Sequence, residues 1–181
     1  MIRPALSPGR RHLPADRPRY VPGVAERLEP MSHLVFGEAL RWEPNAPEAC
    51  LLSDDFARAA LAQRAHPADP DQRCVVLRWD MALLAQMGPP NDEGRQQHRL
   101  YELGLRDMLW LGVVRESELV ARLRPMWSPV GDGRRIQPMH YVVPSKECVV
   151  EVVAADVELL RIDGTPREAA VRSLGLGPNG R

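Results

Sequence analysis

Short apolar runs separated by proline- and glycine-rich turns dominate the chain from residue 32 onward. The run at residues 74–79 (CVVLRW) has the β-branched content and the length of a buried strand. Further strands are predicted at residues 33–42, 49–53, 108–114, 140–143, 148–154 and 157–162. The sequence PSKE at residues 144–147 lies between two of these runs and predicts a hairpin.

Two segments have the features of short helices. Ser117 is a suitable N-cap for a helix that ends before Pro125, and Leu119, Val120 and Leu123 fall on one face of it. Thr165 is a suitable cap for a second helix at residues 166–174.

Residues 56–65 leave two interpretations open. Ser53 or Asp54 could cap an alanine-rich helix there. The alternative is a strand within a meander across residues 49–79, which we favour because turn-rich sequence flanks the segment and residues 66–73 (HPADPDQR) form a clear turn.

The two ends of the chain lack such patterns. Residues 1–30 contain six prolines and six arginines, so they bury too little apolar area to offset the entropy of ordering them. We therefore predict a disordered tail at residues 1–31, which an over-extended translation start ahead of Met31 would also explain. A flexible tail is predicted at residues 171–181. Between them, residues 32–170 are predicted to form one α+β domain, mainly an antiparallel curled β-sheet with one or two short helices.

The composition of the chain argues against several classes of function. Lys+Arg and Asp+Glu both number 24, and this balance argues against a nucleic-acid-binding protein with a broad cationic face. No apolar run approaches the roughly 20 residues that span a bilayer, which predicts no membrane association. The three cysteines are odd in number and widely spaced, which favours reduced thiols in a cytoplasmic protein and gives no zinc-site spacing.

Residues 88–101 (GPPNDEGRQQHRLY) concentrate polar and titratable groups without apolar periodicity. Such a segment is predicted to run over the surface, outside the core, as a loop of the kind that carries functional residues. Asp92, Glu93 and His98 could supply a general base and a general acid, with Asn91 as an anchor for a polar ligand. The same residues are also typical of an ordinary turn.

Residues near the predicted hairpin complete the candidate site. His140 is a second candidate acid, and Tyr101, Tyr141 and Cys148 are candidate ligand-binding residues. On an extended strand Glu151 shares a face with Val149, so a buried Val149 would require a partner for the carboxylate. No metal site is predicted, and the sequence identifies no cofactor.

The central part of the chain resembles a family of small bacterial proteins of uncharacterised function. The resemblance covers residues 88–154 and rests on Pro90-Asn91-Asp92-Glu93, His98-Arg99-Leu100-Tyr101, a strand–helix unit at residues 110–119, His140-Tyr141 and Glu147-Cys148. The chain departs from the usual pattern at Arg99, where proline is common, and in lacking a longer His-Asp loop before the cysteine. The resemblance implies a location for the site and no particular reaction.

Three functional hypotheses follow from these residues. The first is a binding module that holds a small polar molecule or a partner-protein segment at residues 88–101. The second is a hydrolase or lyase with Asp92 or Glu93 as base and His98 or His140 as acid. The third is a partner protein whose exposed sheet edge pairs with another chain. Convergence of these carboxylates and imidazoles on one pocket would favour the enzyme.

Overall fold

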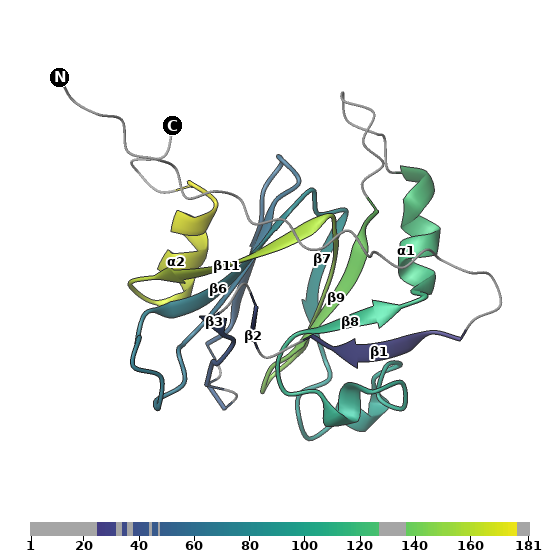
Figure 1. The fold of residues 1–181 in the computed structure, drawn as a ribbon, viewed down its shortest axis with the longest axis horizontal. Coiled ribbons are helices and arrows are strands. Elements are labelled where there is room, and N and C mark those ends of the chain that lie inside the picture. The colour runs from purple at the N-terminus through teal and green to yellow at the C-terminus, as the bar shows by residue number, and fades with distance from the viewer. Residues whose placement is uncertain are drawn as a thin grey trace.

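The computed structural model describes residues 25–31, 34–35, 38–43, 45–46, 48–126 and 137–176. Two antiparallel sheets face each other, with helix α2 beside one and helix α1 beside the other (Figure 1). This arrangement confirms the prediction of an α+β protein that is mostly antiparallel sheet with few helices. No helix in these ranges is long and apolar enough to cross a membrane.

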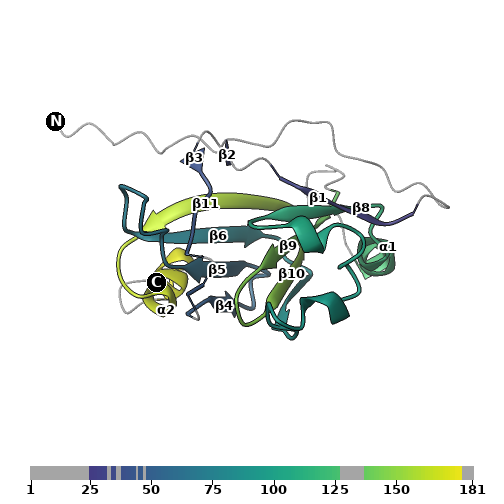
Figure 2. The same cartoon turned by 90° about the horizontal axis from the view of Figure 1, so that it is seen from below.

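Strands from distant parts of the sequence make up each sheet. The five-stranded sheet has the order β1 (Arg27–Pro30), β8 (Gly112–Arg115), β9 (Met139–Pro144), β10 (Val149–Ala154) and β7 (Leu84–Gly88). The four-stranded sheet has the order β11 (Asp156–Ile162), β6 (Cys74–Asp80), β5 (Ala59–Gln63) and β4 (Cys50–Ser53). A separate two-stranded hairpin joins β2 (Leu34–Val35) to β3 (Glu38–Ala39) and lies to one side of both sheets (Figure 2).

The chain passes from one sheet to the other at two corners. The connection from β10 to β11 is the single residue Ala155, whose N–H donates to the carbonyl of Asp80. The connection from β6 to β7 lies next to it, and there the N–H of Leu83 donates to the carbonyl of Val153. Strand pairs that continue through such bends hold the two sheets together in a fixed relation.

Alternating side chains of both sheets fill the space between them. Leu61, Leu77 and Trp79 point inward from the four-stranded sheet, and Val150 and Val152 meet them from β10. All five have 1% of their surface exposed or less. Strands β5 and β10 are buried on both faces, which explains why they are apolar at every position except Gln63 and Glu151.

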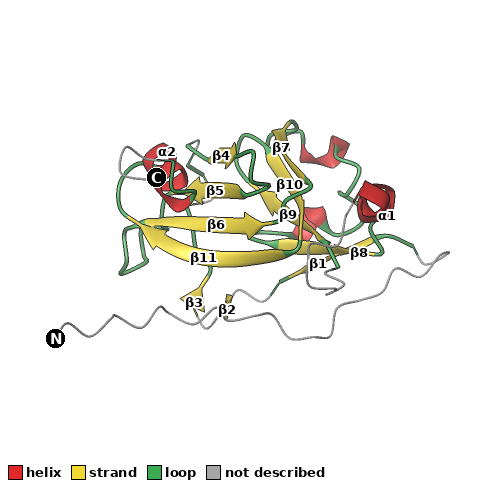
Figure 3. Ribbon diagram, turned by 90° about the horizontal axis from the view of Figure 1, so that it is seen from above, coloured by secondary structure: helices red, strands yellow, loops and turns green. Residues whose placement is uncertain are grey.

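Helix α2 (Pro166–Ser173) covers the outer face of the four-stranded sheet (Figure 3). It begins with a capping box in which Thr165 accepts the N–H of Glu168, and the Glu168 carboxylate accepts the N–H of Thr165. Ala169, Ala170 and Leu174 pack on the sheet. The helix therefore extends past residue 171, which corrects the predicted start of the C-terminal tail.

The outer face of the five-stranded sheet is covered by the segment between β7 and β8, which contains the short 3-10 helices η1 (Arg95–Gln97) and η2 (Leu105–Asp107), and by α1 (Glu118–Leu123). Leu100, Leu105 and Met108 of this segment are buried against strand residues. Gly104 has φ +128°, and a Cβ there would lie 2.5 Å from the carbonyl oxygen of Leu28. Glycine at this position lets the segment lie directly on β1.

Five points of the sequence prediction need correction. Residues 27–30, assigned to the disordered tail, form β1, because each pairs with a residue of β8. The strand predicted at 108–114 begins only at Gly112, and the one predicted at 33–42 is interrupted into β2 and β3. Strand β7 was not predicted. The loop at residues 88–101 does contribute to the core, because Leu100 is fully buried. Residues 1–24 and 177–181 lie outside the described residues.

The remaining predicted elements are confirmed. Residues 56–65 contain strand β5, as the favoured meander requires. Residues 140–143 and 148–154 form the hairpin of β9 and β10. Both helices occur with Ser117 and Thr165 as N-caps.

Candidate functional site

A buried carboxylate, Glu151, lies on the outer face of the five-stranded sheet, on β10 beside the edge strand β7. It shares that face with Val149, and both residues have 4% of their surface exposed. Gln86 lies directly opposite Glu151 on β7 and donates its amide N–H to Oε1 at 3.0 Å. The sequence predicts that the Glu151 carboxylate needs a partner if Val149 is buried. Val149 is buried, and the carboxylate does have partners.

The imidazole of His140 is the second buried member of this group. It comes from β9, where it is diagonal to Glu151, and it is fully buried. Its Nε2 lies 2.9 Å from Oε2 of Glu151, a close ion-pair distance without the alignment of a good hydrogen bond. Its Nδ1 is hydrogen-bonded to the hydroxyl of Ser117 at 2.9 Å.

The segment over the sheet contributes His98 and Arg99. Nε2 of His98 lies 3.7 Å from Oε1 of Glu151, and Nη2 of Arg99 donates to Oε2 at 2.5 Å. We call Glu151, His140, His98, Arg99 and Gln86 the Glu151 cluster. Gln86 reaches the carboxylate from the edge strand β7, and His98 and Arg99 reach it from the segment that covers the sheet.

Hydrogen bonds connect two members of the Glu151 cluster, Arg99 and His140, to the first turn of helix α1. Nη1 of Arg99 donates to Oε2 of Glu26 at 3.2 Å, and Oε1 of Glu26 accepts the N–H of Glu118 at 3.1 Å. At the other end, Ser117 Oγ accepts the N–H of Val120 at 3.2 Å. The chain of contacts therefore starts and ends at α1 and ties together the segment before β1, the covering segment and the sheet.

Opposing effects act on the ionisation of Glu151. Burial by itself raises the pKa of this carboxyl group. Contacts with the imidazoles of His140 and His98, and the charge of Arg99, outweigh burial and hold the pKa well below its usual range. Glu151 is therefore an ionised carboxylate at neutral pH, and the cluster stabilises it as such.

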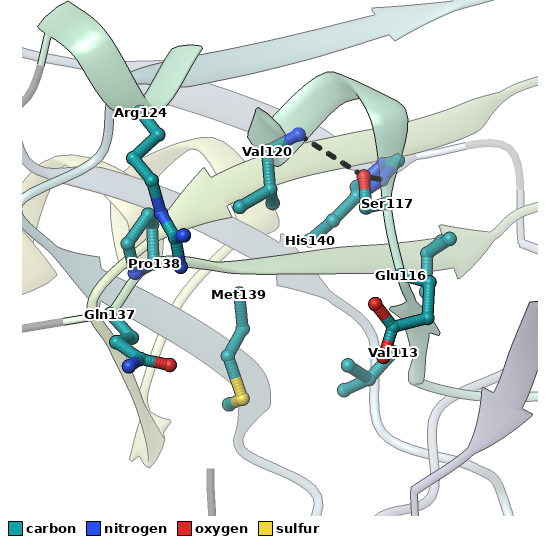
Figure 4. A pocket seen from close by; sticks show the side chains of 10 residues that line it. Val113, Glu116, Ser117, Val120, Arg124, Gln137, Pro138, Met139 and His140 are labelled. Atoms are coloured by element: carbon teal, nitrogen blue, oxygen red, sulfur yellow. Dashed lines mark hydrogen bonds between the residues drawn. The ribbon is translucent and has the colours of Figure 1, made fainter. Parts of the chain in front are cut away.

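Two cavities lie on either side of α1. The smaller has a volume of about 40 Å³ and is lined by Ser117, Val120 and His140, with Glu116, Arg124 and Met139 around them (Figure 4). The larger, of about 390 Å³, is a groove lined by Leu84 and Gln86 of β7, Arg99, and four residues of α1: Glu118, Leu119, Arg122 and Leu123. We call it the α1–β7 groove.

Ser117, His140 and Glu151 have the order of groups found in hydrolytic triads, but two observations argue for a structural role. Ser117 Oγ already accepts a helix N–H as the N-cap of α1, as the dashed line in Figure 4 shows. The adjoining cavity of about 40 Å³ admits little more than water, so an acyl group has no room beside the hydroxyl. The three residues instead fix α1 to the sheet.

The predicted acidic residues lie away from the cluster. Asp92 and Glu93 are exposed. Asn91 Oδ1 accepts the N–H of Gly94, and Asp92 Oδ1 accepts the N–H of Glu93, so both side chains hold a turn. The N–H of Asp92 donates to the carbonyl of Lys146, which places this turn beside the β9–β10 hairpin.

The other predicted residues divide between the two faces of the sheet. His98 and His140 come together at Glu151 on the outer face. Tyr141 and Cys148 belong to the core between the sheets, where the Tyr141 ring lies 6.1 Å from that of Trp79. Burial, followed by the charge of Glu147, raises the pKa of the Cys148 thiol, so it stays protonated. Tyr101 is half-buried in the covering segment.

The structure predicts different stability effects for His98 and Asp92. His98→Ala is expected to lower the free energy of unfolding by about 1 kcal/mol, because Nδ1 accepts the N–H of Leu100 and the ring borders Glu151. Asp92→Asn, which keeps Oδ1, is expected to change it by less than about 0.5 kcal/mol. Urea denaturation of the two variants measures both values, and equal effects would contradict the separation of the two residues.

Sequence reasoning did not assign a functional role to Arg99, Gln86 or the α1 residues of the groove. Arg99 was visible only as a departure from a motif, and Gln86 lies on a strand that was not predicted. The only signal for Glu151 was its position on the same strand face as Val149. In the described ranges no three His, Cys, Asp or Glu side chains are placed to hold a metal ion.

Comparison with known proteins adds no assignment: no protein-family model, curated protein sequence or solved structure matches this chain. The resemblance of residues 88–154 to a bacterial family therefore stays a prediction.

Proposed function

We propose that this protein is a binding module that holds a small polar molecule in the α1–β7 groove. The observation that carries the proposal is the groove itself, whose volume of about 390 Å³ falls within the range of pockets that enclose small organic ligands. It combines leucine side chains with a few polar groups, which is the usual composition of such pockets.

The position of the groove also supports this proposal. Arg99 belongs to residues 88–101, the segment in which the sequence predicts ligand binding. Its guanidinium is held by Glu26 and Glu151, and the side chain of Gln86 is held by Glu151. Groups fixed in this way need little further ordering when a ligand binds, so less binding free energy is lost.

The alternative of a hydrolase or lyase has less support. Asp92 and Glu93, its candidate bases, are exposed in a turn, while the carboxylate near both His98 and His140 is Glu151. That carboxylate is buried beneath its partners and lacks access to a substrate of any size. A cytoplasmic location is part of our proposal, because Cys50, Cys74 and Cys148 are all free thiols.

A thermal-shift screen against a library of small metabolites tests the proposal. A ligand that binds the folded state raises its stability, by about 2.7 kcal/mol at a concentration of 100 times Kd. We expect at least one compound to raise the melting temperature of the protein. The variant Leu119→Trp, which fills the groove, should lose that rise relative to its own ligand-free melting temperature.

Leu109→Trp is the matched control, because Leu109 is 64% exposed and does not line the groove. It should keep the full ligand-induced shift. A screen in which no compound stabilises the protein, or a shift that survives Leu119→Trp, would contradict the proposal.

A further inference from the structure

One of the two cations that line the α1–β7 groove, Arg122, is open to an anionic ligand. Arg99 and Arg122 contribute two cations, and Glu118 contributes one carboxylate. Arg99 is committed to Glu26 and Glu151, whereas Arg122 is exposed and makes no hydrogen bond or ion pair with the residues that the structure describes. The guanidinium of Arg122 is therefore available at the wall of the groove, and guanidinium groups bind carboxylates through paired N–H donors.

The protein already binds a carboxylate of its own next to this groove. The Glu26 carboxylate is only 12% exposed and accepts one hydrogen bond from Arg99 and one from the N–H of Glu118, both of which are groove residues. A side chain from the segment before β1 thus fills the position beside Arg99, which leaves Arg122 as the guanidinium of the groove that a ligand can reach. This contact shows that Arg99 and the backbone N–H of Glu118 accommodate a carboxylate.

The apolar part of the groove determines the rest of the ligand. Leu119 and Leu123 lie one turn apart on α1, and Leu84 belongs to the facing strand β7. Each of these leucines is partly exposed, so each retains apolar surface that a ligand could cover. A molecule that is ionic at both ends would leave this surface in water.

We propose that the α1–β7 groove binds an aliphatic carboxylate, with its acid group on Arg122 and its apolar chain against Leu84, Leu119 and Leu123. This inference rests on the proposed binding function and names the ligand class for the same site. The groove is partly open to solvent and has a volume of about 390 Å³, so a short chain is favoured over a long one that would extend into solvent.

Titration with hexanoate, followed by the NMR signals of leucine methyl groups, tests the ligand class. Hexanol and hexylamine are matched probes with the same chain and a neutral or cationic head, and hexyl phosphate presents a different anion. We expect hexanoate to shift the methyl signals of Leu84, Leu119 and Leu123 and to bind at least about tenfold more tightly than hexanol or hexylamine.

Variants of Arg122 locate the acid group. Arg122→Gln should weaken hexanoate binding about tenfold or more, and Arg122→Lys should retain part of it because the charge remains. Arg106→Gln is the control, since Arg106 is 60% exposed and does not line the groove, and it should leave the affinity unchanged. Arg122 is exposed on α1, so these substitutions leave the core intact.

Each other outcome has a separate meaning. Preference for hexylamine, equal binding of hexanol, or much tighter binding of hexyl phosphate would overturn the carboxylate assignment and leave the binding function in place. Equal loss of hexanoate binding in Arg122→Gln and Arg106→Gln would overturn the role of Arg122. If neither these probes nor the metabolite library bound to the groove, both the ligand class and the proposed function would be rejected.

Discussion

Replacing Glu151 with glutamine is expected to lower the free energy of unfolding by about 3 kcal/mol at pH 7. Glutamine keeps the shape of the side chain but removes the charge that balances Arg99 and that contacts both His98 and His140. A buried ion pair that loses one partner leaves the other uncompensated. We place the effect at the lower end of the usual range because Arg99 is 46% exposed and can be hydrated. Urea denaturation at pH 7 measures the change.

The difference between the native protein and Glu151→Gln should also depend on pH. The pKa of Glu151 is lowered by folding, so its stabilisation is complete above the unfolded-state pKa of about 4.3. The stabilisation is lost as the pH falls towards the folded-state pKa, because the native carboxylate then has to take up a proton. The gap between the two proteins should therefore narrow as the pH falls below about 5.

Glu158→Gln provides the control for this substitution. Glu158 is 50% exposed and pairs with Arg78 at the surface, and exposed pairs contribute about 0–1 kcal/mol. If Glu151→Gln were as mild as Glu158→Gln, the cluster would contribute nothing particular to stability, and its role in fixing α1 to the sheet would be refuted.

Replacing Leu100 with alanine is expected to destabilise the protein by about 2–5 kcal/mol. Leu100 belongs to the covering segment and is fully buried against the apolar side chains of Leu28, Val142 and Val149. Removal of its side chain leaves a cavity at the place where this segment is held on the sheet. Chemical denaturation gives the loss of stability, and amide exchange in residues 95–108 should become faster.

Leu109→Ala is the matched control for Leu100→Ala. It removes the same atoms from the same segment, but Leu109 is 64% exposed, so the expected change is within about 0.5 kcal/mol. Similar values for the two variants would mean that the segment is not anchored through Leu100, and that His98 and Arg99 are not held in place by this contact.

The strand and helix predictions succeeded where the signal was local. Residues 74–79 form a mainly apolar run with two valines because β6 lies between two other strands of its sheet, and Ser117 and Thr165 cap helices through bonds to residues three positions away. Strand β7 was missed because its sequence, LAQMG, has little β-branched content and forms a strand through its pairing with β10. Strand β1 contains Pro30 and forms a strand through its pairing with β8.

The candidate site was located only in part. The polar segment at residues 88–101 does carry His98 and Arg99, but the acidic triplet that drew attention to it forms a turn. Alternation along β9 places His140 and Tyr141 on opposite faces, so adjacent residues that were predicted to act together are separated by the sheet. The sequence does not say which face is covered by polar partners.

The sequence by itself determined the local elements of this protein: the strand-rich pattern, both helix caps and the turns between strands, because each depends on residues close together in the chain. Only the tertiary structure decided that Glu151 is buried and which groups compensate it. Its partners come from β7, the covering segment and β9, up to 65 residues away, and the network continues to Glu26. Contacts over such separations arise from strand order and sheet curvature, and neither is encoded in the spacing of residues along the chain.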